Sequence, residues 1–460
     1  MYMKDGPTPE HRRRPPGARL PAFALAAFAL LWTARATALP SFATQTGMPC
    51  SQCHVIAFGP ALTAYGRQFK LNAYTLGEAS SSMPLAVMLQ GGFEHTSAAQ
   101  SAAPAPHFAD NNNFSVDQAS VFVGTRISEH TGLFAQATYD GDARHFNWDN
   151  TDLRYARPLS LFGTDEIVGV SVNNNPTVQD LWNSTPAWGF PYISSRLVPS
   201  PAASPIIAGT LAQLVVGATG YTMIHDRLYL EAGGYRGLSN RWLDNVGLYP
   251  SMSPHVKGVA PYYRATYQFS GESHYFSFGT FGLDVKLQPD LVSPATNHYT
   301  DLGLDAVYQF SNRGPHGILV NLSDIRERQN LSASFAGGNA ANSKDELNLL
   351  RLDAEYIYRH TWGGTLAVFD VTGSADAGLY APSPLTGSSS GSPGSRGYIA
   401  QLEYVPFGKA GSWSGPWLNV RVGLQYTGYA KFNGGTSNYD GFGRAASQNN
   451  SLFLFYWLAF

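Results

Sequence analysis

The strongest constraint on the fold is a pattern of short alternating segments that runs from residue 84 to the C-terminus. Segments of about ten residues, separated by clusters of Gly, Asn, Ser and Pro, often alternate apolar and polar side chains. Within 350–359, the apolar and aromatic side chains face one way and the charged ones the other: Leu350, Leu352, Ala354, Tyr356 and Tyr358 against Arg351, Asp353, Glu355 and Arg359. Strands of this kind suit lipid on one face and water on the other, so the pattern predicts an all-β, transmembrane antiparallel β-barrel.

We count sixteen such segments. An even number puts both barrel ends on one side of the membrane, and about sixteen strands enclose a lumen wide enough for a plug or an aqueous channel. The predicted strands are 85–95, 115–127, 132–140, 148–157, 166–173, 210–221, 226–236, 261–269, 274–287, 298–310, 316–328, 347–360, 363–374, 396–407, 417–432 and 451–460.

Composition and the C-terminus agree with a membrane barrel. Only 13% of the residues are charged, against about 25% in soluble domains, and a formal net charge of -2 gives no indication of a nucleic-acid partner. Residues 451–460 form an aromatic-rich segment that resembles the last strand of bacterial outer-membrane proteins. A soluble β-sandwich is the alternative, but it rarely contains so many strands of this length. In a barrel, the acidic positions Asp301, Asp305, Asp353 and Glu355 are expected to line a solvated lumen.

Residues 1–38 are interpreted as an export signal. A basic stretch at 11–14 precedes an apolar run at 20–32 and a small-residue cleavage site at 36–38, so the mature chain is predicted to begin near Leu39. The apolar run falls short of the 18 or so residues that a spanning helix needs. An uncleaved helical anchor is the alternative, and either interpretation places the remaining chain outside the cytoplasm.

The only two cysteines lie in the motif Cys50-Ser51-Gln52-Cys53-His54, the C-x-x-C-H pattern of c-type haem attachment. Two thiols one helical turn apart can add to the two haem vinyl groups, while the adjacent imidazole reaches the iron from the same side. A thioredoxin-like dithiol is an alternative that requires a surrounding α/β domain. A zinc site requires a remote fourth ligand, and a disulfide here closes too small a loop to stabilise the chain much.

The haem module is predicted to span 39–83, with the barrel occupying 84–460. Residues 59–76 carry a mixed pattern with Pro60 and Gly66, which indicates one or two short helices packed on the haem edge. About forty residues cannot bury a core of their own, so the haem or the barrel wall must complete the packing. We therefore expect a small helical plug in the lumen or on its periplasmic side.

Three stretches carry a resemblance to a known family. Residues 40–54, residues 66–76 and the sequence Asn173-Asn174-Asn175-Pro176-Thr177-Val178-Gln179-Asp180-Leu181-Trp182-Asn183 resemble the fused outer-membrane monohaem c-type cytochrome-porins of iron-oxidising bacteria. The resemblance implies a bacterial outer-membrane protein that oxidises extracellular Fe(II) at one covalent haem c and passes electrons to a periplasmic cytochrome or copper protein. As an enzyme it would be an Fe(II):cytochrome or Fe(II):cupredoxin oxidoreductase.

Carried over by motif, Cys50 and Cys53 are the covalent attachment points and His54 is the proximal ligand of the haem iron. Arg67 and Lys70 are candidate partners of the haem propionates through charge-assisted hydrogen bonds. Candidates for the distal ligand are Met83, Met88 and His95, which lie far enough downstream for the chain to fold back. Met48 is too close to His54 in sequence to reach the opposite haem face easily, and an open coordination position is a further alternative.

Two other functions remain open at this stage. One is a haem-bearing porin for solute passage, or a conduit for a donor other than Fe(II). The other is a soluble periplasmic cytochrome enzyme, which predicts extraction without detergent.

Overall fold

The computed structural model describes residues 41–77, 85–161, 163–248, 255–289, 294–311, 314–415 and 418–460. All of these residues belong to one compact unit. The predicted export signal, the predicted boundary at 83/84 and the distal-ligand candidate Met83 lie outside the described residues.

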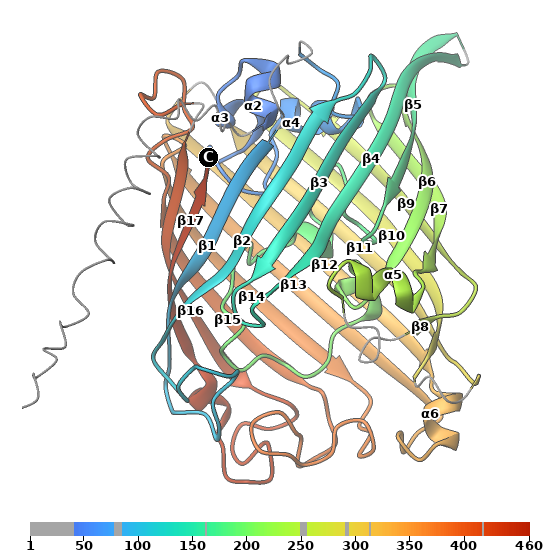
Figure 1. The fold of residues 1–460 in the computed structure, drawn as a ribbon, viewed down its shortest axis with the longest axis vertical. Helices are drawn as coiled ribbons and strands as arrows, with labels where there is room; N and C mark the ends of the chain where they lie inside the picture. The colour runs from blue at the N-terminus through green and yellow to red at the C-terminus, as the bar shows by residue number, and fades with distance from the viewer. Residues whose placement is uncertain are drawn as a thin grey trace, which may run out of the picture. The chain divides into compact units, whose positions relative to one another are not determined.

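The described residues form one closed antiparallel barrel (Figure 1). Its strands are β1 (Leu85–Thr96), β2 (Asn113–Arg126), β3 (Thr131–Asp140), β4 (His145–Leu161), β5 (Thr164–Asn173), β6 (Val215–Ile224), β7 (Leu228–Gly237), β8 (His255–Val256), β9 (Val259–Ser270), β10 (His274–Gln288), β11 (Asn297–Ser311), β12 (His316–Asn330), β13 (Lys344–Tyr358), β14 (Trp362–Gly373), β15 (Ser395–Tyr404), β16 (Asn419–Lys431) and β17 (Ser451–Ala459).

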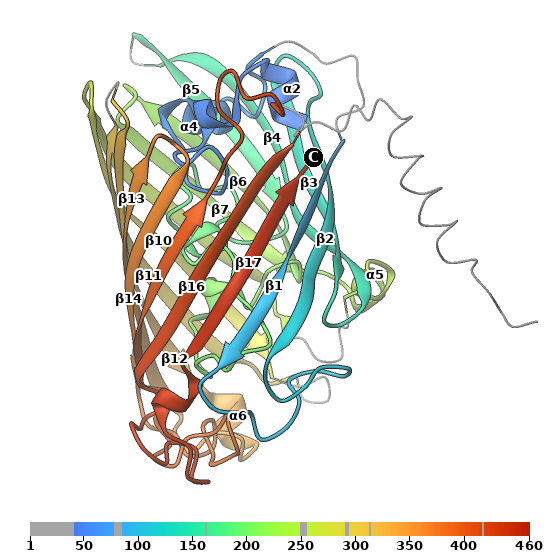
Figure 2. The same ribbon diagram turned by 90° about the vertical axis from the view of Figure 1, so that its left-hand side faces the viewer.

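The two-residue β8 belongs with β9, because both pair with β10 and only Lys257 and the left-handed Gly258 separate them. Counted this way, the described residues confirm the predicted sixteen strands. β1 closes the ring against β17, with Met88 opposite Ala459 and Thr96 opposite Ser451 (Figure 2). Each predicted segment overlaps one observed strand.

The alternation has the predicted orientation. On β11, the side chains of Leu302 and Leu304 are 46% and 53% exposed on the outer surface, while Asp301 and Asp305 point inward and are almost fully buried. β13 repeats the arrangement, with Leu352 and Tyr356 outward. The barrel therefore presents an apolar outer surface and a polar inner one, as expected of a membrane barrel.

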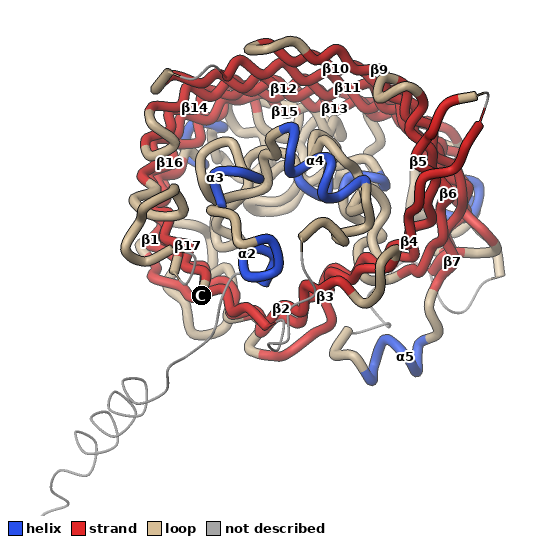
Figure 3. Tube along the Cα trace, turned by 90° about the horizontal axis from the view of Figure 1, so that it is seen from above, coloured by secondary structure: helices blue, strands red, loops and turns tan. Residues whose placement is uncertain are grey.

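Three short helices lie inside one end of the ring of strands: α2 (Ser41–Thr46), α3 (Cys50–Cys53) and α4 (Ala64–Leu71) (Figure 3). We call residues 41–77 the plug. Two further helices lie away from the plug: α5 (Asn240–Asn245) is outside the ring of strands (Figure 3), and α6 (Ser332–Ala336) is at the opposite end of the barrel (Figure 1). None of the helices in the described part of the chain is long and apolar enough to cross a membrane.

The connection between β5 and β6, residues 174–214, folds into the lumen, and we call it the inner loop. It contains two 3-10 turns, η1 (Pro186–Trp188) and η2 (Ile206–Ala208). Its backbone binds wall carboxylates, because Ile206 N donates to Glu327 Oε2 at 2.6 Å and Ile207 N to Asp301 Oδ2 at 2.8 Å. The strand predicted from residue 210 begins only at Val215, since 210–214 still belong to this loop.

The expectation of a solvated lumen wall is therefore wrong at four acidic positions. Asp301, Asp305, Asp353 and Glu355 point inward as predicted, but each has 6% or less of its surface exposed. The plug and the inner loop fill the space that water would otherwise occupy. Buried carboxylates need hydrogen bonds or cations. The inner loop supplies hydrogen bonds to Asp301 and Asp305, and Arg264 of β9 supplies a cation to Asp305.

Candidate haem-attachment site

The C-x-x-C-H motif forms the short helix α3, which is fixed at both ends. Ser51 N donates to the Gly408 carbonyl at 2.9 Å, which ties the helix to the connection between β15 and β16. Thr63, the residue before α4, donates its backbone N–H to the Cys53 carbonyl at 2.9 Å and its hydroxyl to the Gln52 carbonyl at 2.5 Å. α3 and α4 are thus held as one rigid corner.

Both thiols and the imidazole of the motif line a single cavity of about 580 Å³. Its walls come from three parts of the chain. The plug contributes Phe42, Phe58, Phe69 and the motif; the barrel contributes Ala86, Met88, Phe122, Phe134 and Trp457; and the inner loop contributes Pro186, Trp188, Pro191 and Tyr192. Cys50 and Cys53 are not joined in a disulfide. A largely apolar cavity of this size is typical of a cofactor site.

The motif side chains are uncharged at neutral pH. Burial raises the pKa of the Cys50 thiol, and it raises the pKa of Cys53 to about 12 with a further contribution from Cys50. Burial lowers the pKa of His54 to about 4, and the positive charge of Arg421 acts in the same direction. His54 Nδ1 is buried and has no hydrogen-bond partner in the described structure. No group of three or more His, Cys, Asp or Glu within the described ranges is placed to hold a metal ion.

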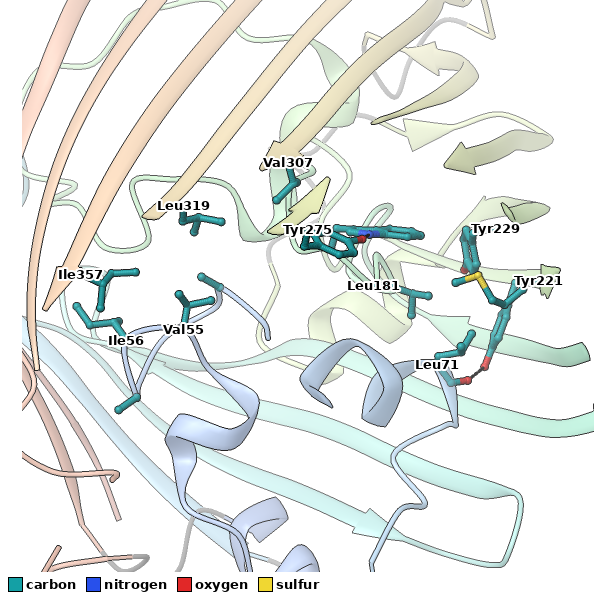
Figure 4. Close-up of a cluster of buried hydrophobic side chains, with 14 of the residues drawn as sticks. Val55, Ile56, Leu71, Leu181, Tyr221, Tyr229, Tyr275, Val307, Leu319 and Ile357 are labelled. Atoms are coloured by element: carbon teal, nitrogen blue, oxygen red, sulfur yellow. Dashed lines mark hydrogen bonds between the residues drawn. The ribbon is translucent and has the colours of Figure 1, made fainter. Parts of the chain in front are cut away.

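The plug is packed against the barrel wall by a shared apolar core. Val55 and Ile56 of the plug lie near Leu319 and Ile357 of the wall, and Leu71 of the plug lies beside Tyr221 (Figure 4). Wall side chains also bind plug backbone carbonyls. These contacts are His360 Nδ1 to Val55 at 2.7 Å, Asn419 Nδ2 to Ala57 at 2.7 Å, Arg421 Nη1 to Phe58 at 3.2 Å, Arg154 Nη1 to Lys70 at 3.0 Å and Tyr221 Oη to Leu71 at 2.9 Å.

The two candidate propionate partners, Lys70 and Arg67, have different surroundings in the structure. Lys70 lines the cavity, but its ammonium donates to the Val178 and Asp180 carbonyls of the inner loop, at 2.8 Å and 2.5 Å. Arg67 does not line the cavity, because its guanidinium lies 3.7 Å from the centroid of the Tyr275 ring on the other side of α4. Both cations therefore fasten the plug to the barrel and its inner loop.

The two candidates for the distal ligand that the structure describes, Met88 and His95, also lie in different places. Met88 points inward from β1 and lines the cavity together with the motif. His95 is exposed at the far end of β1, where its Nδ1 lies 2.7 Å from Asn112 Oδ1. At about 3.3 Å per residue, His95 is on the order of 20 Å further along the strand than Met88. The structure therefore brings Met88, and not His95, to the motif.

Sequence reasoning missed the contribution of the inner loop and of the terminal strand. Trp188 and Tyr192 line the cavity from the inner loop, and Trp457 does so from β17, where Phe58 packs on it with ring centroids 4.9 Å apart. The inner loop could have been recognised from its Pro-, Ser- and Asn-rich, non-alternating sequence. Two contacts explain the inward aromatic face of β17: Trp457 packs on Phe58 of the plug, and Phe453 and Phe455 pack on Ile193 of the inner loop.

Gly66 allows α4 to approach the C-x-x-C-H motif closely. A larger side chain at this position therefore tests the corner formed by α3 and α4. A Cβ at this position would overlap the Cys53 carbonyl oxygen and lie 3.1 Å from Leu62 Cδ2. Alanine normally favours a helix over glycine by about 1 kcal/mol, but overpacking costs about 1–3 kcal/mol. We expect Gly66→Ala to lower the midpoint of urea unfolding, measured from the fraction of folded protein on unheated gels.

Gly220→Ala is the matched control, because its Cβ would meet no atom within 4 Å. An unchanged midpoint for both variants would show that the α3–α4 corner tolerates expansion.

No protein-family model and no curated protein matches the chain. Among solved structures, it is similar to an anion-selective porin from Comamonas acidovorans, with 11% identity, 82% of this chain and 98% of that chain covered, and a TM-score of 0.46. It is also similar to the trimer form of OmpT, an outer membrane protein of Vibrio cholerae, with 9% identity, 82% and 98% coverage, and a TM-score of 0.43. The outer membrane channel DcaP of Acinetobacter baumannii gives 11% identity, 82% and 96% coverage, and a TM-score of 0.41. At these identities the likeness extends to the barrel fold alone.

Proposed function

We propose that this chain is an outer-membrane electron-transfer protein with one c-type haem on Cys50, Cys53 and His54. It takes electrons from an extracellular reductant, Fe(II), and delivers them to a periplasmic cytochrome or copper protein. The single observation that carries the proposal is the enclosure of both thiols and the imidazole in one cavity inside a barrel.

The residues of the cavity fit a haem in size, polarity and donor set. Each thiol would add, hydrogen included, across one haem vinyl group, and the neutral His54 imidazole offers a lone pair to iron. Phe42 and Phe69, whose ring centroids are 4.9 Å apart, supply apolar surface on the plug side. When bound, the haem supplies a one-electron iron couple. The chain's own residues hold it, shield it from water and fix its distance from the two sides of the membrane.

The lengths of the connections between strands support one orientation of the barrel in the outer membrane. Most turns at the plug end are short, as at 127–130, 225–227 and 271–273, with 405–418 the longer exception, whereas the opposite end carries 97–112, 374–394 and 432–450. Outer-membrane barrels have short periplasmic turns and long extracellular loops. The plug end would therefore face the periplasm, next to the acceptor.

A second cavity supports access from the outer side. It has a volume of about 240 Å³ and lies between the inner loop and the inner faces of β13 to β17. Pro191 lines both this cavity and the one that contains the motif. A small hydrophilic reductant would approach the site along this side of the lumen.

A haem-bearing porin is the second candidate function, because a barrel of sixteen strands encloses a lumen wide enough for solutes. The filled lumen argues against free passage. The plug is fixed by buried hydrogen bonds to several strands, and the inner loop is bonded to the wall at Glu327 and Asp301. Movement of either part would leave buried polar groups without partners.

The test uses lipid vesicles that contain the purified protein and enclose an oxidised soluble c-type cytochrome. We expect Fe(II) added outside to reduce the enclosed cytochrome with wild-type protein and not with the Cys50→Ser/Cys53→Ser variant. We also expect both proteins to give low and equal conductance in planar bilayers. Equal reduction with both proteins would show that Fe(II) passes through the barrel, which would favour the porin instead.

A further inference from the structure

We propose that the barrel wall itself supplies the distal haem ligand, the thioether of Met88 on β1. This inference rests on the proposed function, because it requires that a haem occupies the cavity. It makes the haem a link between two parts of the chain, with the proximal side held by the plug and the distal side by the barrel.

Several side chains that line the cavity carry atoms that could bind a haem iron. Apart from the motif itself, amide groups and indole N–H groups, the lining side chains with nitrogen, oxygen or sulfur donors are Ser41, Thr46, Met48, Lys70, Tyr74, Met88, Asp149 and Tyr192. Ser41 and Thr46 carry neutral aliphatic hydroxyls, which bind haem iron weakly. Burial raises the pKa of Tyr192 well above its ordinary value and keeps the phenol protonated. The Lys70 ammonium is saturated by three acceptors, since it donates to Asn183 Oδ1 at 2.9 Å as well as to two carbonyls.

The two remaining oxygen donors are also engaged. The Tyr74 hydroxyl donates to Asp152 Oδ2 at 2.7 Å. Asp149 Oδ2 accepts from Thr138 Oγ1 at 2.6 Å, and its Oδ1 accepts from Asn150 N at 2.8 Å. The two thioethers are therefore the neutral donors best placed to turn to iron, because Met88 Sδ would give up only the weak hydrogen bond that it accepts from Gln90 Nε2 at 3.6 Å.

Sequence distance and strand geometry favour Met88 over Met48. Met48 lies two residues before Cys50 on the segment that also carries the proximal ligand, so it stands on the motif side of the cavity. Met88 comes from the barrel wall and not from the plug, since Ala86, Met88 and Gln90 of β1 all point inward and line the cavity. A distal ligand must approach the haem face opposite the proximal imidazole.

The surroundings of Met88 hold its sulfur in place. The side chain is 6% exposed, and Gln90 Nε2 lies 3.6 Å from Met88 Sδ. Gln90 Oε1 in turn accepts a hydrogen bond from Gln118 of β2. On its other side β1 pairs with β17, with Met88 opposite Ala459 at the closure of the barrel. The thioether thus comes from a wall position fixed on both sides, and such a ligand raises the reduction potential relative to a second histidine.

The experiment compares Met88→Leu with Met48→Leu as the matched control, and uses Met88→His as a second variant at the same position. Leucine conserves the volume of methionine closely enough for the cavity to tolerate it. Each variant is first checked for covalent haem by the pyridine haemochrome spectrum. The readouts are the near-infrared sulfur-to-iron charge-transfer band of the oxidised protein and the midpoint potential.

We expect wild type and Met48→Leu to show the charge-transfer band, and Met88→Leu and Met88→His to lack it. We expect Met88→His to give a low-spin spectrum with a lower midpoint potential. Retention of the band in Met88→Leu, or its loss in Met48→Leu or in Met83→Leu, would overturn the assignment while leaving the proposed function intact. Absence of covalent haem from the wild-type protein would overturn both.

Discussion

We expect the replacement of Cys50 and Cys53 together by serine to abolish the proposed covalent haem attachment, so that the chain loses its haem-stained band on a denaturing gel completely. The reason is chemical: the two thioether bonds need both sulfur atoms, and the sequence contains no other cysteine. Because the cavity wall is otherwise unchanged, the barrel should still fold and migrate as a compact species without heating. The measurement is haem staining of outer-membrane fractions, paired with an immunoblot for the chain.

Ser51→Ala is the matched control for this pair. Ser51 lies between the two cysteines, and only its backbone N–H is fixed, through the Gly408 carbonyl. Its side chain can be removed without touching the donor set, so haem staining should equal that of wild type. Covalent haem in the double-serine variant, or none in wild type, would show that the motif is not an attachment site.

Removing the buried cation that joins the inner loop to the wall has the second largest expected effect. Arg264 of β9 lies 2.8 Å from Asp305 Oδ2 of β11 and 3.2 Å from Asp180 Oδ1 of the inner loop, and all three side chains are 1% exposed or less. Arg264→Met leaves two buried carboxylates without this partner. Breaking a buried ion pair costs about 3–5 kcal/mol. We expect the free energy of unfolding, from urea titration of the folded fraction, to fall by that amount.

An exposed pair provides the comparison. Arg396 and Asp370 lie 2.6 Å apart, but the Arg396 side chain is 65% exposed. Arg396→Met should cost about 0–1 kcal/mol, because solvent already screens this pair. Arg264→Lys should fall between the two, since lysine keeps the charge but loses the forked geometry. Equal midpoints for Arg264→Met and Arg396→Met would show that the inner loop is not fastened by this cation.

The strands were predictable because their signal is local. In 350–359 the alternation alone predicts that Leu352 and Tyr356 face outward and Asp353 and Glu355 inward, and the structure has them so. The period of two along a strand makes side-chain orientation a property of neighbouring residues. The C-x-x-C-H motif is local for the same reason, because its chemistry depends on spacing within one helical turn.

The contents of the lumen were not predictable in the same way. Asp305 was expected to meet water and instead meets Ser184 Oγ of the inner loop at 2.6 Å and Arg264 of another strand. Arg67 and Lys70, three residues apart, were expected to act on one ligand and instead contact Tyr275 and the inner loop. Arg264 is 41 positions from Asp305, and the other partners lie more than one hundred residues away, so no periodicity in the sequence encodes them.

The sequence by itself determined the barrel, the inward and outward faces of its strands and the residues available to attach a haem, because each depends on spacing over a few residues. Only the tertiary structure decided that the plug and the inner loop fill the lumen, that their carbonyls and carboxylates are satisfied by wall side chains, and that Met88 rather than His95 faces the motif. The physical reason is that closing a barrel brings distant strands around one space. What each inward side chain meets there depends on how that space is packed.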